Sequence, residues 1–144
     1  TAENVARRHQ ITRKRQEELA VLSHRKAAVA RGEGRLKDEI VPVSVNGRTV
    51  DADGCIRADT SLEALAELKP AFATDGSVTA ATSSPLTDGA SAVLVTSEDY
   101  AKAHGLKPLA RIRSIAVAGC DPEVMGMGPV AATNKALASM RKPA

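Results

Sequence analysis

The residues best suited to ligand binding lie in one run, 78–90, which reads VTAATSSPLTDGA. A short β-branched segment leads into a turn built from Ser, Thr, Pro and Gly. Small hydroxyl side chains and glycine let a ligand approach the backbone closely, and open α/β sheets bind ligands at the carboxyl ends of their strands. The pattern predicts either a ligand cradle or a plain connection between two strands, and spacing alone does not separate these interpretations.

Nucleophiles and bases are few. Cys55 and Cys120 are too far apart in sequence to suggest a disulfide framework or a zinc knuckle. Near Cys55, Arg57 would lower the pKa of the thiol and Asp53 would oppose it. The three histidines (His9, His24 and His104) lie on expected helices among Arg and Lys, without the spacing of a metal or catalytic pair. We therefore expect no catalytic residue and no metal site in this chain.

The elements that must position these residues follow from caps, turns and periodicity. We expect helices at 1–9, 12–31, 60–68, 97–105 and 130–140, the second capped by Thr12 and the third opened by a capping box of Thr60 and Glu63. We expect a hairpin of 40–45 with 48–50 around Asn46-Gly47, and strands at 78–80, 92–96 and 110–118. Alternation of strand and helix in the second half predicts an α/β fold with a parallel-type sheet. Pro42 makes the hairpin an edge or a protruding arm.

Composition narrows the function further. Aromatic residues make up 1% of the 144 residues, which argues against stacking on nucleic-acid bases. The net charge is +3, and many of the basic residues precede position 32, forming either a solvated helical face or a patch facing phosphates, nucleic acid or an anionic membrane. No apolar stretch approaches the length of a membrane span. We expect a soluble protein in a reducing compartment, and a fragment, since the chain begins without Met inside an expected helix.

Run 78–90 resembles the thiolases, whose pattern is close to V-T-A-x-N-S-S-x-L-x-D-G-A. Thr82 stands where the family usually has Asn, and Pro85 where many members have Gly, so this turn is expected to be stiffer. Other segments agree in the same order along the chain: TAENVA (1–6), DEIVPV (38–43), IRADTSLEALAELKPAF (56–72), GLKPLARIRS (105–114) and DPEVMGMGPVAATNKAL (121–137). The wording TAATSSPLTDGASA is most similar to the fatty-acid-oxidation branch.

The resemblance implies a fragment of the five-layered α/β thiolase fold. Residues 1–76 correspond to part of the loop domain, and residues 77–144 to the end of the N-terminal half and the start of the C-terminal half. Arg57 falls on a position that meets the nucleotide end of coenzyme A. Ser84 falls on the serine that contacts the pantetheine arm, with Ser83 beside it.

The resemblance also implies an activity for the parent protein. It would be an acyl-CoA C-acyltransferase that cleaves 3-ketoacyl-CoA or condenses acetyl-CoA through an acyl-cysteine intermediate. The reactive cysteine and activating histidine would lie outside this chain, so the chain alone is expected to be inactive. Coenzyme A and acyl-CoA would be substrates, with no tightly bound cofactor.

The expected partners and location follow from the same resemblance. The parent would be a homo-oligomer, either a dimer or a tetramer, or part of a multifunctional β-oxidation complex, and it would bind no nucleic acid. It would lie in the cytoplasm, or in the mitochondrial matrix of a eukaryote. Two alternatives remain open: a non-catalytic oligomerisation element built on the hairpin, and a basic module that binds anions.

Overall fold

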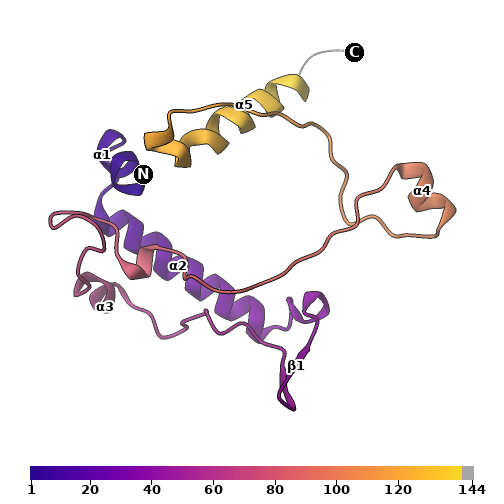
Figure 1. Ribbon diagram of the computed structural model, residues 1–144, viewed down its shortest axis with the longest axis horizontal. Coiled ribbons are helices and arrows are strands. Elements are labelled where there is room, and N and C mark those ends of the chain that lie inside the picture. The colour runs from indigo at the N-terminus through magenta and orange to yellow at the C-terminus, as the bar shows by residue number, and fades with distance from the viewer. Residues whose placement is uncertain (141–144) are drawn as a thin grey trace. The chain divides into compact units, whose positions relative to one another are not determined.

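Helices dominate the computed structural model, which describes residues 1–140 (Figure 1). The α-helices are α1 (Ala2–Arg8), α2 (Arg13–Gly32), α3 (Leu62–Ala66), α4 (Glu98–Ala103) and α5 (Gly128–Met140), and the 3-10 turns are η1 (Lys37–Glu39), η2 (Ala80–Thr82) and η3 (Pro122–Met127). Strands β1 (Val43–Val45) and β2 (Arg48–Val50) form an antiparallel pair. The chain divides into one unit at residues 2–85 and another from Leu86 onward. The boundary predicted at 76/77 stays a prediction.

The first unit is organised around α2, against which both α3 and η2 pack. Thr12 caps α2 as predicted, since its hydroxyl accepts a hydrogen bond from the Arg15 N–H at 3.3 Å. The apolar side chains buried in this unit are those of Val21, Leu65 and Val78. They come from α2, from α3 and from the segment before η2, so one small core joins these three elements.

Arg13 fastens α3 to α2. Its Nη2 donates to the carbonyls of the last turn of α3 and just beyond, those of Leu65 (3.0 Å), Ala66 (3.0 Å) and Leu68 (2.6 Å). Its Nε donates to Glu17 at 2.7 Å, and the Glu17 side chain is only 7% exposed. A guanidinium fork thus satisfies carbonyls that a helix end leaves without partners.

The predicted cap of α3 is wrong by one residue. Ser61, rather than Thr60, is the N-cap, and its hydroxyl accepts from the Ala64 N–H at 3.2 Å. Serine is a better N-cap residue than threonine, which favours a helix that begins directly after Ser61.

The predicted hairpin is confirmed, but its first strand begins at Val43 and not at residue 40, because Ile40 ends the preceding 3-10 turn. Val43 pairs with Val50 and Val45 with Arg48, and the turn residues Asn46 and Gly47 have φ of 50° and 75°. Two consecutive positive φ values match the type I′ turn that suits the twist of a hairpin. The valines of both strands stay at least half exposed, at 57%, 51% and 53% for Val43, Val45 and Val50.

The second unit contains α4, η3 and α5. Ser97 caps α4 through a bond from the Tyr100 N–H at 3.1 Å, and Gly105 follows with φ of 62°, both as predicted. The last helix begins at Gly128, two residues before the predicted start, and it packs on η3. The Ser114 hydroxyl donates to the Ala136 carbonyl at 3.1 Å and so ties the preceding segment to α5.

The strands predicted at 78–80, 92–96 and 110–118 are wrong for residues 1–140, where the only ladder is that of β1 with β2. The Val78 carbonyl accepts a single bond, from the Ala71 N–H at 2.8 Å. Val93, Leu94 and Val95 have exposed fractions of 88%, 76% and 70%. A strand requires a neighbour to pair its backbone groups, and no described segment lies beside these residues in a ladder.

Candidate ligand-binding site

The predicted cradle begins at Thr79, which is completely buried. The Thr79 N–H donates to the Thr82 hydroxyl oxygen at 2.9 Å. The Thr79 carbonyl accepts from the Thr82 N–H at 3.2 Å, from the Thr82 hydroxyl at 3.2 Å and from the Ser83 hydroxyl at 3.0 Å. Hydroxyl groups of the turn itself therefore close it, and Thr82 makes three of these four contacts, two of them through its hydroxyl.

The two predicted cradle serines differ in availability. Both are exposed directly after η2, but the Ser83 hydroxyl proton is already donated to Thr79. The Ser84 hydroxyl has no hydrogen bond within residues 1–140 and is free to contact a ligand. Ser84 is therefore the better candidate for direct contact, and Ser83 holds the turn in shape.

Arg57 lies in the loop before α3 and is exposed. Its backbone N–H donates to Nδ1 of His24, on α2, at 3.2 Å, which requires Nδ1 to be unprotonated. Its guanidinium has no hydrogen bond within the described part of the chain, so its donors are available for an anion or a purine face. No hydrogen bond or ion pair among residues 1–140 joins Arg57 to Ser83 or Ser84; α2 supports the two loci separately.

Asp53 and Arg57 act in opposite directions on the pKa of the Cys55 thiol, and the effect of Asp53 is the larger. Asp53 accepts the Cys55 N–H at 2.6 Å, and a hydrogen bond from the thiol to the same carboxylate raises the pKa of Cys55 above its ordinary value. The backbone N–H of Cys55 in turn lowers the pKa of Asp53. A thiol held protonated in this way is a poor nucleophile at neutral pH.

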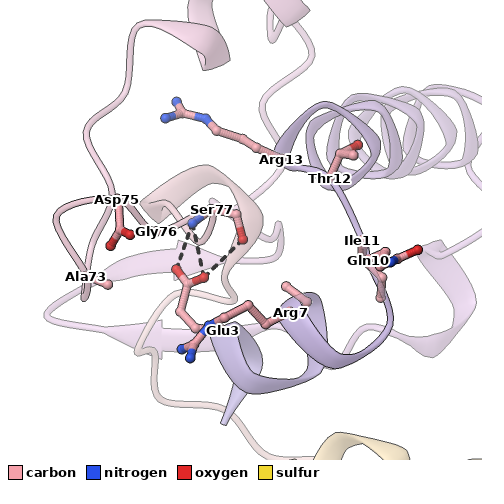
Figure 2. Close-up of a pocket in the computed structure, with 11 residues that line it drawn as sticks. Glu3, Arg7, Gln10, Ile11, Thr12, Arg13, Ala73, Asp75, Gly76 and Ser77 are labelled. Carbon is pink, nitrogen blue, oxygen red and sulfur yellow. Dashed lines mark hydrogen bonds between the residues drawn. The ribbon is translucent and has the colours of Figure 1, made fainter.

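A contact that the sequence did not predict lies just before the cradle. The Glu3 carboxylate, from α1, accepts the Ser77 N–H (2.9 Å), the Val78 N–H (2.8 Å) and the Ser77 hydroxyl (3.1 Å), as Figure 2 shows for Ser77. The bond from the Val78 N–H is the largest of the causes that hold the pKa of Glu3 below its ordinary value. Glu3 lies in the first turn of α1, and no local sequence pattern connects it to a segment 74 residues away.

These groups border an open depression of about 580 Å³ between α1, the start of α2 and residues 73–77 (Figure 2). Its lining is mixed in charge, since it includes the basic residues Arg7 and Arg13 and the acidic residues Glu3 and Asp75. Because Glu3 and Arg13 are already committed to internal hydrogen bonds, the depression serves first to join elements.

The remaining candidates carry little chemistry. His104 stacks on Tyr100 with ring centroids 4.0 Å apart, and its Nδ1 lies 3.0 Å from the Tyr100 carbonyl. Within residues 1–140 no three His, Cys, Asp or Glu side chains are grouped to hold a metal. None of the helices described is both long and apolar enough to cross a membrane.

Residues 1–99 match the family model for the thiolase N-terminal domain. The chain is 53% identical over 143 residues to a 3-ketoacyl-CoA thiolase of Marinobacter nauticus, covering 95% of this chain and 37% of that protein. It is 51% identical over 141 residues to an acetyl-CoA acetyltransferase of Paracoccus denitrificans, covering 95% of this chain and 36% of that protein. The chain thus spans little more than a third of the length of these relatives.

Solved structures agree. The acetyl-CoA acetyltransferase of Bacillus anthracis superposes with a TM-score of 0.91 at 44% identity, over 99% of this chain and 37% of that one. Human mitochondrial 3-ketoacyl-CoA thiolase in complex with CoA gives a TM-score of 0.88 at 43% identity, over 94% of this chain and 34% of that one. The predicted fold class, an α/β fragment of the thiolase fold, is confirmed. This chain belongs to the thiolase family.

Proposed function

We propose that residues 1–144 form the coenzyme A-binding central segment of a full-length acyl-CoA C-acyltransferase. That enzyme cleaves 3-ketoacyl-CoA or condenses acetyl-CoA through an acyl-cysteine intermediate, with coenzyme A and acyl-CoA as substrates. The reactive cysteine and its activating histidine come from outside this segment. The names of its relatives, 3-ketoacyl-CoA thiolase and acetyl-CoA acetyltransferase, support the reaction class.

The observation that carries the binding proposal is the availability of Ser84 and Arg57. Ser84 offers an unpaired hydroxyl at the end of a turn held rigid by Thr82, where a pantetheine amide can be bound. Arg57 offers a planar guanidinium for the nucleotide end of the same ligand. The human relative solved with CoA, which superposes over 94% of this chain, is consistent with this role.

The raised pKa of Cys55 supports the proposal that the reactive cysteine comes from outside this segment. Thiolysis through an acyl-cysteine requires a thiolate nucleophile, and Asp53 raises the pKa of Cys55, which disfavours the thiolate. The segment therefore supplies binding contacts and leaves the bond-making groups to other parts of the enzyme. Its place in fatty-acid β-oxidation, in the cytoplasm or the mitochondrial matrix, belongs to the same proposal.

The test uses the full-length enzyme and titrates it with coenzyme A by calorimetry. Ser84→Ala and Arg57→Ala should each weaken the affinity about five- to tenfold, as expected for the loss of one hydrogen-bonding group. Matched controls are Ser23→Ala and Arg15→Ala, which remove an exposed serine and an exposed arginine from α2. If the affinities of the Ser84 and Arg57 variants equal those of the controls, the site is wrongly assigned.

A second candidate function rests on the hairpin. Val43 and Val45 project from the same side of β1, and Val50, paired with Val43, projects beside them. An exposed apolar face of this kind on a two-stranded ribbon favours contact with a second copy of the chain. We propose this hairpin as an oligomer contact of the parent enzyme, compatible with the coenzyme A-binding role.

A further inference from the structure

The backbone that leads into the cradle is held by a polar cluster, which we call the Glu3 latch: Glu3, Gln16, Ser77 and Val78. One carboxylate oxygen of Glu3 accepts both backbone N–H groups, and the other accepts the Ser77 hydroxyl at 3.1 Å. Gln16, from α2, donates its amide to the same hydroxyl at 2.8 Å. Two helices therefore fix the position of Ser77, and Figure 2 shows the contacts that come from Glu3.

The latch depends on a glycine immediately before it. A Cβ on Gly76 would lie 2.4 Å from a carboxylate oxygen of Glu3 and 2.9 Å from the Ala73 carbonyl oxygen. Any larger residue would push the backbone away from the carboxylate. The close approach of this segment to α1 thus depends on the carboxylate of Glu3 and on the absence of a side chain at Gly76.

Only Thr79 separates the latch from η2. Its N–H and carbonyl form the turn that ends at Ser83 and Ser84, so the turn takes its orientation from the backbone fixed at Val78. Thr79 and Val78 are both buried, which leaves this short connection little freedom to absorb a shift. A displacement at Ser77 should therefore reach the Ser84 hydroxyl, where small errors of position weaken a ligand contact.

We propose that Glu3 is a positioning residue for coenzyme A binding, acting through Ser77 and Val78 on the turn that presents Ser84. The inference rests on the proposed function, because it assumes that this turn meets the pantetheine arm. Glu3 itself does not touch the ligand. A role in folding alone would lower stability without changing the affinity of the folded enzyme for coenzyme A.

The test is steady-state thiolysis by the full-length enzyme, varying coenzyme A at saturating 3-ketoacyl-CoA. Both carboxylate oxygens of Glu3 accept hydrogen bonds. In Glu3→Gln, an NH2 group replaces one of these oxygens and cannot accept a hydrogen bond. The KM for coenzyme A should rise about tenfold while kcat changes less than about twofold. Ser77→Ala, which keeps both backbone bonds to Glu3, should raise the same KM about threefold. Glu18→Gln, the same change at an exposed residue of α2, should leave both constants unaltered.

The outcomes separate the two levels of the proposal. An unchanged KM for coenzyme A in Glu3→Gln, beside a raised KM in Ser84→Ala, overturns the role of Glu3 and leaves the binding site standing. Unchanged KM values in Ser84→Ala and Arg57→Ala overturn the site itself, whatever Glu3→Gln does. If Glu3→Gln does not fold, Ser77→Ala decides: a KM equal to that of wild type overturns the positioning role.

Discussion

At the scale of single residues, the carboxylate of Asp53 determines how reactive the thiol of Cys55 is. Asp53 and Arg57 flank Cys55 with opposite charges, so sequence alone could not tell which would govern the thiol. The structure places the Asp53 carboxylate within hydrogen-bonding reach, and the pKa of Cys55 rises. The hydrogen bond with Asp53 here outweighs the positive charge of Arg57, which is exposed to solvent.

Replacing Asp53 should therefore make Cys55 more reactive. The raised pKa keeps the group as a thiol to higher pH, and Asp53→Ala removes the cause, so the thiolate fraction at pH 8 increases. Alkylation of Cys55 by iodoacetamide, followed by peptide mass spectrometry, should proceed about two- to fivefold faster. Asp51→Ala, a change at another exposed acid, should leave the rate unaltered. Equal rates for both variants would contradict the influence of Asp53.

At the scale of elements, one arginine joins two helices. Arg13 satisfies carbonyls at the end of α3 and at the same time pairs with Glu17, which is buried. Such a contact has a large cost when broken, because the partner carboxylate then remains buried without a counter-ion. The pair with Glu17 has the i,i+4 spacing of a helix, but the contacts with the α3 carbonyls have no signature in local sequence, since those residues are more than fifty positions from Arg13.

Arg13→Ala should lower the free energy of unfolding of the full-length enzyme by about 3 kcal/mol, measured by urea denaturation. The double variant Arg13→Ala with Glu17→Ala should lose less than the sum of the two single changes, since the uncompensated charge is gone. Arg15→Ala, which removes an exposed arginine two residues away, should fall within about 0.5 kcal/mol of wild type. A loss in Arg13→Ala no greater than in Arg15→Ala would show that the clamp is not formed.

At the scale of the whole molecule, many large apolar side chains among residues 1–140 lie exposed. The exposed fractions are 100% for Leu109, 78% for Ile115 and 57% for Val43. Surfaces of this kind normally meet other protein.

The exposed valines of the hairpin are the surface that we expect to contact a second copy of the chain. Changing Val43 and Val45 to serine in the full-length enzyme should lower the molar mass measured by light scattering, because it makes the shared valine face polar. The control is Val29→Ser, which changes a valine that is 56% exposed on α2. A mass unaffected by the hairpin changes would remove the oligomer contact from the proposal.

Local signals predicted local structure well. Thr12 and Ser97 as caps, Asn46-Gly47 as a hairpin turn and Gly105 as a helix end are all confirmed, because each depends on a few adjacent residues. The strands at 92–96 and 110–118 were wrong because a ladder needs a neighbour that sequence periodicity does not supply.

The same distinction applies to the candidate site. Ser83, Ser84 and Arg57 were found by resemblance, and their roles stay predictions. Glu3 and Arg13 were missed, because a contact between residues more than fifty positions apart is fixed by tertiary packing and leaves no trace in spacing. Departure from the family pattern at Thr82 proved informative, since its hydroxyl closes the turn from both sides.

The helix α2 carries Arg13, which holds α3, and His24, which holds the loop of Arg57. Eleven residues along a helix make about three full turns, so the two attachment points share one face and stand about 16 Å apart. Inserting a single residue between them would swing one attachment about 100° around the axis relative to the other. Lineages of this protein should therefore tolerate substitutions along this stretch far more readily than any gain or loss of length.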